Sequence, residues 1–169
     1  NQHPLKTPIT LHHIKITYIA GGVEAKHRFM MTKDNTIYGV GCNNKRQLSF
    51  SNEDEQYEHI EMTQLTYFAE RSLNISQIQC AYNFTAFLDT NGQIWISGLL
   101  NQIYLSWAKY SGAGEIYALN EGENMKQIVC SEHYLMALDY NGNVYGWGKI
   151  DGMYKQNEKK LIWKAKDGN

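Results

Sequence analysis

The sequence lacks an excess of charge of either sign. Its 16 Lys+Arg are balanced by 17 Asp+Glu, which leaves a formal net charge of -1 over 169 residues. A protein that binds nucleic acid by neutralising phosphates usually carries a basic excess or a basic patch. The charge balance therefore argues against a nucleic-acid partner for this segment.

Long hydrophobic runs are also missing. No apolar stretch approaches the roughly 18 residues of a membrane-spanning helix, and no basic segment followed by an apolar one marks a signal peptide. The composition of 43% hydrophobic, 12% aromatic and 20% charged residues is typical of a folded globular protein. We therefore expect a folded chain with no membrane partner.

Cysteine is scarce and without a pattern. Cys42, Cys80 and Cys130 are an odd number, widely spaced, with no C-x-x-C and no Cys/His pair at metal-ligand spacing. Neither a disulfide framework nor a zinc site is indicated. Reduced thiols favour an intracellular location, in the cytoplasm or in a cytoskeletal or organellar assembly, with the nucleus as another compartment.

Catalytic motifs are absent as well. The histidines are scattered, and His12-His13 has no third ligand near it in the sequence. Ser97-Gly98 lacks the glycine pattern of a nucleophile elbow. Gly112-Ala113-Gly114 is not followed by the Gly-Lys-Ser/Thr of a phosphate-binding loop. We expect no enzyme activity, no cofactor and no bound metal.

What the chain does contain is an internal repeat. Three segments share one sequence motif: Asp34–Gly41, Asn91–Gly98 and Asn141–Gly148. They recur about every 50 to 57 residues, an interval typical of repeat folds. Each is a β-branched and aromatic run on either side of a turn signal. The repeat therefore predicts one β-hairpin per unit.

Each predicted hairpin carries the same kinds of residue at the same places. Asn-Gly favours the positive φ of a type I′ turn, and Asn without glycine is a weaker version of that signal. A large aromatic ring follows, suited to packing one sheet on the next. A glycine is the last residue of the motif, as in a tight bend at a strand end. The expected structural residues are Asn35, Gly92 and Gly142 in the turns; Tyr38, Trp95, Tyr145 and Trp147 among the rings; and Gly41, Gly98 and Gly148 at the close.

The repeat extends upstream of each turn. Phe29–Met31, Ala86–Leu88 and Met136–Leu138 occupy equivalent places, and still earlier Ala20, Cys80 and Cys130 share one position in this alignment. Free cysteine commonly behaves as a small apolar residue. Cys80 and Cys130 are thus interpreted as fillers of a repeated core site and not as redox groups.

The linking stretches complete three units, at about 8–50, 57–105 and 115–154, within a single and incomplete repeat domain covering 1–169. Outer strands are expected at Pro8–Leu11, near Ile60 and at Glu115–Leu119, with a short helix from about Met62 to Arg71. Residues 155–169 are either a tail or the start of a further repeat, with Leu161–Lys164 as its opening strand.

These units resemble the repeats of the regulator of chromosome condensation family, which form the blades of a seven-bladed β-propeller. The third unit has Asn141-Gly142, Val144-Tyr145 and Trp147-Gly148 of that family's signature. The first has His27, and it keeps Gly41, Asn43, Gln47 and Leu48 in register. The resemblance spans about Pro8 to Tyr154. It implies an all-β fold, a partial propeller of about three four-stranded blades.

The chain departs from the family signature at several positions. Arg46 and Ser49 replace the last two glycines in the first unit, and Ser97 replaces the tryptophan in the second. Phe84 and Tyr134 stand where the signature has histidine. Such degenerate repeats imply a protein-interaction role more than one particular activity.

The resemblance leaves three functions open. The favoured one is a non-catalytic interaction scaffold or structural subunit within a larger assembly, with partner proteins at its open edges and at loops around 43–46, 101–114 and 149–159. The family's founding member suggests a second, a guanine-nucleotide exchange factor for a small GTPase, although no segment here matches its exchange hairpin. The third is a regulatory region of a larger enzyme such as a kinase or ubiquitin ligase.

Three blades cannot close a ring of this family's curvature, since propellers close with about 4 to 8 blades. Several hundred Å² of apolar face left open at each end would cost on the order of 10 kcal/mol at roughly 25 cal/mol per Å². We therefore expect a longer polypeptide, or other chains that complete or cap this one.

Overall fold

The computed structural model describes residues 14–50, 58–100, 116–119, 124–148 and 159–165. Within them lie three four-stranded antiparallel sheets and one short helix, α1 (Tyr67–Glu70). The first sheet consists of β1 (Ile16–Ala20), β2 (His27–Thr32), β3 (Ile37–Cys42) and β4 (Glu58–Leu65). The second consists of β5 (Ile75–Cys80), β6 (Phe84–Asp89), β7 (Ile94–Gly98) and β8 (Tyr117–Ala118). The third consists of β9 (Met125–Cys130), β10 (Tyr134–Asp139), β11 (Val144–Gly148) and β12 (Lys160–Trp163).

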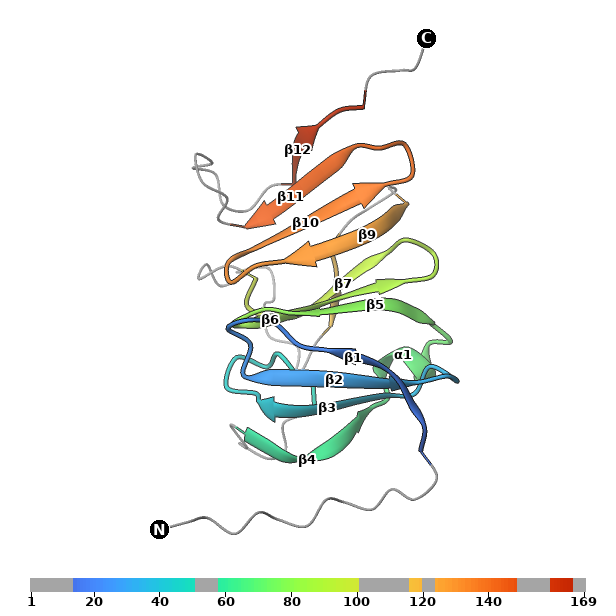
Figure 1. Cartoon of the computed structure of the whole chain (residues 1–169), viewed down its shortest axis with the longest axis vertical. Helices are drawn as coiled ribbons and strands as arrows, with labels where there is room; N and C mark the ends of the chain where they lie inside the picture. Colours follow the sequence, from blue (N-terminus) through green and yellow to red (C-terminus); the bar gives the residue numbers. More distant parts are fainter. Residues whose placement is uncertain (1–13, 51–57, 101–115, 120–123, 149–158, 166–169) are drawn as a thin grey trace.

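The three sheets follow one another in space as they do in sequence. Figure 1 shows the second sheet between the first and the third, and strand β5 contacts both β1 and β9. These three strands, the first of each sheet, are called the inner strands here. The predicted all-β fold and its three blade-like sheets are confirmed.

The fourth strand of each sheet differs from the sequence prediction. The segment near Ile60 pairs with β3, Tyr117–Ala118 pairs with β7, and Lys160–Trp163 pairs with β11. Each segment thus completes the sheet before it, and Leu161–Lys164 does not open a fourth unit. The physical reason is the antiparallel ladder: each strand pairs with the exposed edge of the sheet that the chain has just built. The expected strand at Pro8–Leu11 lies outside the described residues.

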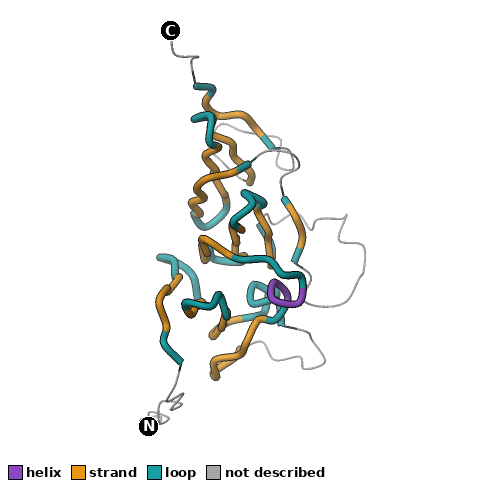
Figure 2. Tube along the Cα trace, turned by 90° about the vertical axis from the view of Figure 1, so that its right-hand side faces the viewer, coloured by secondary structure: helices purple, strands orange, loops and turns teal. Residues whose placement is uncertain are grey.

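The predicted helix is also shorter than expected. Residues 62–65 belong to β4, where Leu65 lies opposite Ile37 and is buried, and the helix covers only Tyr67–Glu70. Cross-strand pairing with β3 outweighs the helical preference of this segment. Figure 2 shows the helix beside the junction of the first two sheets. No helix among the described residues is long and apolar enough to span a membrane.

Two hydrophobic cores fill the spaces between the sheets. Between the first and second, Phe29 and Phe87 pack edge to face with centroids 5.2 Å apart, and Phe68 of α1 lies 4.9 Å from Phe87. Between the second and third, Phe84 and Leu135 are fully buried in a separate cluster. Aromatic pairs of this geometry add to the stabilisation from burial alone. Each sheet is therefore held by its neighbour, as blades of a propeller are.

Candidate interaction site

The hairpin turns are built by an aspartate that precedes each Asn-Gly. Asp89 Oδ1 accepts the backbone N–H groups of Asn91 at 2.8 Å and of Gln93 at 3.0 Å. The Gly92 N–H donates to the Asp89 carbonyl at 3.1 Å, and Gly92 has φ +80°. Asn91 does not have positive φ, so the predicted type I′ turn is wrong. Instead, the carboxylate favours a type I turn that is followed by one left-handed glycine.

The third sheet repeats this arrangement around Asp139. Its Oδ1 accepts the N–H groups of Asn141 and Asn143, both at 2.8 Å. Burial acts to raise the pKa of Asp139, but the hydrogen bonds from Asn143 and Asn141 outweigh it and hold that pKa below its usual range. In the first sheet, Asn35 takes the left-handed position with φ +64°.

In the second and third sheets the recurring aromatic side chain is hydrogen-bonded to the same aspartate. Trp95 Nε1 donates to Asp89 Oδ2 at 2.9 Å, and the Tyr145 hydroxyl donates to Asp139 Oδ2 at 3.3 Å. Strand pairing places Tyr38, Trp95 and Tyr145 at one repeated position, opposite Met30, Phe87 and Ala137 respectively. The ring thus links the turn to the packing between sheets. Trp147 lies two residues after Tyr145 on the same strand, β11, and is buried in the core between the second and third sheets.

The closing glycines allow a close approach of two backbone segments. A Cβ at Gly148 would lie 2.3 Å from the carbonyl oxygen of His133, and Gly148 has φ +99°. Gly41 and Gly98 have positive φ and approach the carbonyls of Lys26 and Asn83 in the same way. A side chain at any of the three would be strained.

The two repeated cysteines lie in apolar surroundings. Burial raises the pKa of Cys80 to about 12, and burial also raises the pKa of Cys130. Both lie opposite equivalent residues, Thr85 and Leu135. Ala20 does not share their position: it lies opposite Phe29 and therefore corresponds to Gln79, which lies opposite Ala86.

A polar cluster joins the first sheet to the second. His27 Nε2 lies 2.7 Å from Thr85 Oγ1, and the hydroxyls of Thr85 and Ser97 both donate to the Gln47 carbonyl at 2.8 Å. Because the single Thr85 proton points to Gln47, His27 Nε2 must donate to Thr85. Burial, and then the nearby Arg28, lower the pKa of His27 to about 4. The imidazole is therefore neutral at physiological pH.

The segment after β3 carries Gln47 to the second sheet. Asn43 Oδ1 accepts the N–H of Leu48 at 2.9 Å, and Leu48 is fully buried. Arg46 and Ser49 have φ of +62° and +53°. These are the two positions at which the family signature has glycine, so the chain keeps the glycine conformation without the glycine.

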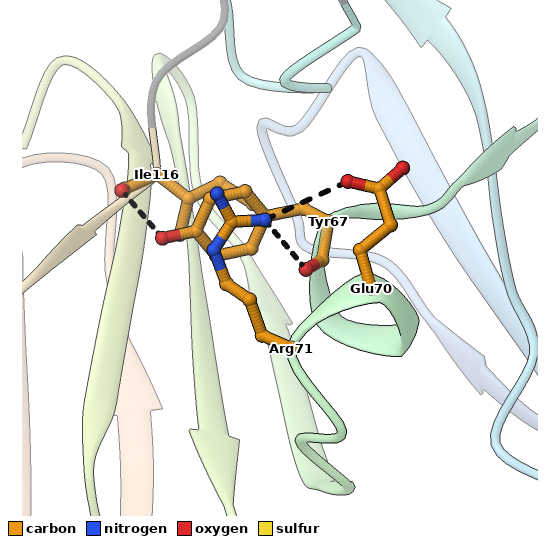
Figure 3. Close-up of polar contacts among 4 residues, drawn as sticks. All are labelled: Tyr67, Glu70, Arg71 and Ile116. Carbon is orange, nitrogen blue, oxygen red and sulfur yellow. Dashed lines mark hydrogen bonds and ion pairs between the residues drawn. The ribbon is translucent and has the colours of Figure 1, made fainter.

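Helix α1 adds a second tie between the first two sheets (Figure 3). The Tyr67 hydroxyl donates to the Ile116 carbonyl at 3.2 Å, across to the end of the second sheet. The Arg71 guanidinium lies 3.8 Å from the centre of the Tyr67 ring and donates to the Tyr67 carbonyl at 3.1 Å. Glu70 lies 3.7 Å from the same guanidinium, in an exposed pair that contributes little to stability. We assign this group a structural role.

The inner strands are joined by side chains that bind backbone. The Tyr18 hydroxyl donates to the Ile78 carbonyl at 3.1 Å and accepts the Ile78 N–H at 3.2 Å. Gln77 Nε2 donates to the Lys126 carbonyl at 3.2 Å, and Gln77 Oε1 accepts the Ile128 N–H at 3.0 Å. Each side chain satisfies a strand edge that the sheets themselves leave unpaired.

Apolar surface is open at both ends of the stack. The leading face, defined as the side of the first sheet turned away from the second, carries Ile19, Arg28, Met30, Tyr38 and Val40. The trailing face, the corresponding side of the third sheet, carries Gln127, Val129, Met136, Leu138, Val144 and Trp163. Ile19 is 77% exposed and Trp163 is 62% exposed.

Of the three loops predicted to bind partners, one is described. Asn44, Lys45 and Arg46 are exposed, so the loop at 43–46 presents polar side chains next to the His27 cluster. The loop at 101–114 lies outside the described residues, as does 149–159 except for Lys159. No cluster of three metal-ligating side chains occurs in the described ranges.

Comparison with known proteins supports the fold. No protein-family model and no curated protein matches the sequence. Among solved structures, human WBSCR16 is similar with a TM-score of 0.69 and 18% identity over 89% of this chain. Prp20p from Saccharomyces cerevisiae, described with its binding properties to Gsp1p and histones, gives a TM-score of 0.69 and 20% identity over 88% of this chain. Yeast RCC1 (Prp20) bound to Kap60 gives 0.62 and 21% identity over 79%.

The chain spans 38% of WBSCR16, 38% of Prp20p and 32% of the Kap60-bound Prp20. Its three sheets therefore correspond to an arc of an RCC1-like propeller, and the predicted resemblance of the repeats is confirmed at the level of fold.

Several residues that organise this arc were not predicted from sequence. Asp89 and Asp139 stand two residues before each Asn-Gly, a spacing typical of Asx turns that could have identified them. Thr85, Tyr18 and Gln77 act between sheets, and no local sequence signal points to them.

Proposed function

We propose that the chain is a non-catalytic interaction scaffold that docks in a larger assembly through its open faces and loops. The carrying observation is the exposed apolar surface of the leading and trailing faces, with Ile19 and Trp163 both more than half exposed. Large apolar side chains gathered on a sheet face mark an interaction surface.

The hydrogen bonding of three buried polar side chains supports the same proposal. His27, Asp89 and Asp139 are buried titratable groups, and each is engaged in structural hydrogen bonds. His27 is fully buried, so a substrate has no access to it. His27 joins two blades, and the two aspartates hold the hairpin turns of the second and third sheets.

Photo-cross-linking of the full-length protein in its own cells tests the proposal that the chain is an interaction scaffold. A photoreactive amino acid at Trp163 is expected to form an adduct with one defined polypeptide, identified by mass spectrometry, because the trailing face is covered in the assembly. The same amino acid at Thr90, an exposed turn residue, is the control. Equal and non-specific adducts at both positions would contradict the proposal.

An exchange factor for a small GTPase is the second candidate, and the observation in its favour is the likeness to Prp20p, which was described with binding to Gsp1p. The test is release of a labelled guanine nucleotide from purified Ran-type GTPase. A scaffold leaves the release rate unchanged, whereas an exchange factor accelerates it in proportion to its concentration.

A further inference from the structure

The two Asn-Gly pairs of the described residues lie in exposed hairpin turns. Asn91 and Asn141 are both exposed, and each is followed by a glycine with positive φ. The turns themselves are held by Asp89 and Asp139, which accept the turn N–H groups. The geometry of each turn therefore does not depend on the asparagine carboxamide, which faces solvent beside a backbone nitrogen that carries no neighbouring side chain.

Two other turn asparagines are tied down. Asn35 Nδ2 donates to the Ile75 carbonyl at 2.8 Å, and Asn35 Oδ1 accepts the Ile75 N–H at 2.7 Å. Asn143 Nδ2 donates to Asp139 Oδ2 at 2.8 Å, and Asn143 Oδ1 accepts the Ala165 N–H at 3.1 Å. Each of the two is followed by a β-branched residue. The chain thus has two restrained turn asparagines with which the two exposed ones can be compared.

An exposed asparagine before glycine can close a ring on its own backbone. The Gly92 nitrogen loses its proton and attacks Cγ of Asn91, so that an N–Cγ bond forms. The Cγ–Nδ2 bond breaks, and Nδ2 leaves as ammonia. Water then opens the resulting succinimide at one of its two carbonyls and gives either aspartate or isoaspartate. Water is the only co-reactant, and a side chain after the asparagine would crowd the ring closure.

We propose that Asn91 and Asn141 are sites of spontaneous deamidation, which convert these turns into isoaspartate-containing ones. The inference goes beyond the scaffold function and does not depend on it. The hydrogen bond from the glycine N–H to the aspartate carbonyl, 3.1 Å long at Gly92 and 3.3 Å long at Gly142, has to open before the ring closes. Exposed turns open locally at a small fraction of the global unfolding free energy.

The product at Asn91 acts on the joint between two sheets. Isoaspartate routes the backbone through the former side chain and adds one methylene group to the turn. Asp89 Oδ1 bridges the Asn91 and Gln93 N–H groups, so the longer backbone disturbs this pair of hydrogen bonds. The Gly92 carbonyl accepts the N–H of Met125, the first residue of β9, at 3.0 Å. Deamidation at Asn91 therefore loosens both the hairpin and its link to the third sheet.

Peptide mapping of the folded protein, aged at neutral pH and physiological temperature, tests the proposal. Asn91 and Asn141 are expected to lose their amides progressively, and faster at higher pH because the glycine nitrogen must lose its proton. Asn35 and Asn143 are expected to keep theirs. A carboxyl methyltransferase specific for isoaspartate, supplied with labelled S-adenosylmethionine, is expected to label the aged protein at the same two positions.

The urea-unfolded chain provides the comparison that decides. If the unfolded chain loses the amides of Asn91 and Asn141 while the folded protein retains both, the native turns protect these residues and the proposal is overturned. Asn91→Gln is the matched variant, since it keeps a carboxamide but needs a less favoured six-membered ring. It is expected to abolish the reaction at position 91 and to leave that at Asn141 unchanged.

Thr36→Gly separates the structural argument from the sequence pattern. The variant creates a third Asn-Gly pair, but the Asn35 carboxamide remains bound to Ile75. Asn35 is therefore expected to keep its amide in the folded variant and to lose it in urea. Equal rates at Asn35 and Asn91 in the folded variant would show that exposure and hydrogen bonding do not decide the reactivity.

The effect on the joint is measured by urea unfolding before and after ageing. The aged wild type is expected to unfold at lower urea, whereas Asn91→Gln loses less on ageing. Asn91→Asp adds the charge without the extra backbone atom, so a smaller loss in this variant assigns the effect to the backbone. A fully converted wild type with an unchanged midpoint overturns the loosening of the joint.

Discussion

Replacing Ser49 with glycine is expected to stabilise the protein. Ser49 has φ +53°, in the left-handed region that non-glycine residues disfavour, and its side chain is buried. Its hydroxyl oxygen finds no hydrogen-bond partner among the described residues. Glycine at this position removes both penalties, and it is the residue that the signature of the resembling family has there.

The size of the effect follows from three contributions. The left-handed conformation costs a non-glycine residue about 1 kcal/mol, and a buried hydroxyl without a partner costs about 1 kcal/mol or more. Against them, glycine has the greater backbone entropy in the unfolded state, which costs roughly 0.5 to 1 kcal/mol. The net gain for Ser49→Gly is therefore about 1 to 2 kcal/mol, or a rise in melting temperature of roughly 2 to 8 °C for a chain of this size.

Urea unfolding of Ser49→Gly and Ser49→Ala separates the contributions. The alanine variant removes the hydroxyl but keeps a Cβ in the left-handed conformation, so it is expected to gain about 1 kcal/mol at most. A glycine variant that unfolds at lower urea than the wild type would refute the reasoning, because it would show that neither the φ angle nor the buried hydroxyl destabilises the native loop.

Three further predictions concern the joints between sheets and turns. Because burial lowers the pKa of His27 from 6.5 to about 4, the unfolded state binds more protons between these values; stability is full above pH 6.5 and falls by up to about 3 kcal/mol as the pH drops to 4. Urea titrations across this range should show the decline in the wild type and a flatter profile in His27→Gln, whereas the depressed pKa of Asp139 acts only below about pH 3.8. Asp89→Ala leaves two turn N–H groups and the Trp95 indole without an acceptor and should cost about 1 to 3 kcal/mol by denaturant unfolding, with Thr90→Ala unchanged. Phe87→Ala, at a fully buried aromatic position, should cost about 3 to 5 kcal/mol in the same assay, and a cost below 1 kcal/mol would contradict the assigned core.

The sequence predicts the hairpins well because their signals are local. The Asn-Gly turns, the repeated ring at Tyr38, Trp95 and Tyr145, and the closing glycines all lie within eight residues of one another in each unit. Adjacent strands pair through such short connections at little entropic cost. The same locality explains the similarity of the three sheets to propeller blades.

Contacts between sheets could not be predicted in this way. The partners Tyr18 and Ile78 are 60 residues apart, and Thr85 and Gln47 are 38 apart. A tyrosine and a glutamine at one structural position also share no sequence pattern, although both have a donor and an acceptor.

The sheet to which each outer strand belongs could not be predicted, for a related reason. A strand such as Lys160–Trp163 has the composition to open a unit or to close one, and only its pairing with β11 decides between the two. The alternation of residues fixes which face is buried but not which neighbouring edge is used. The unit boundaries drawn on the sequence are thus displaced by one strand from the sheets.

Differences among the three repeats specify which sheets pair. At one interface His27 meets Thr85, and at the next the equivalent residues Phe84 and Leu135 lie in an apolar core. If the first sheet packed instead on the third, His27 would face Leu135 and lose its hydrogen bond to Thr85. A buried imidazole left unpaired costs about 1 to 3 kcal/mol, which is a large share of the stability of one domain. Identical repeats would pair in any order and risk misassembly. The departures from the family signature at Phe84 and Tyr134 therefore favour one order of blades.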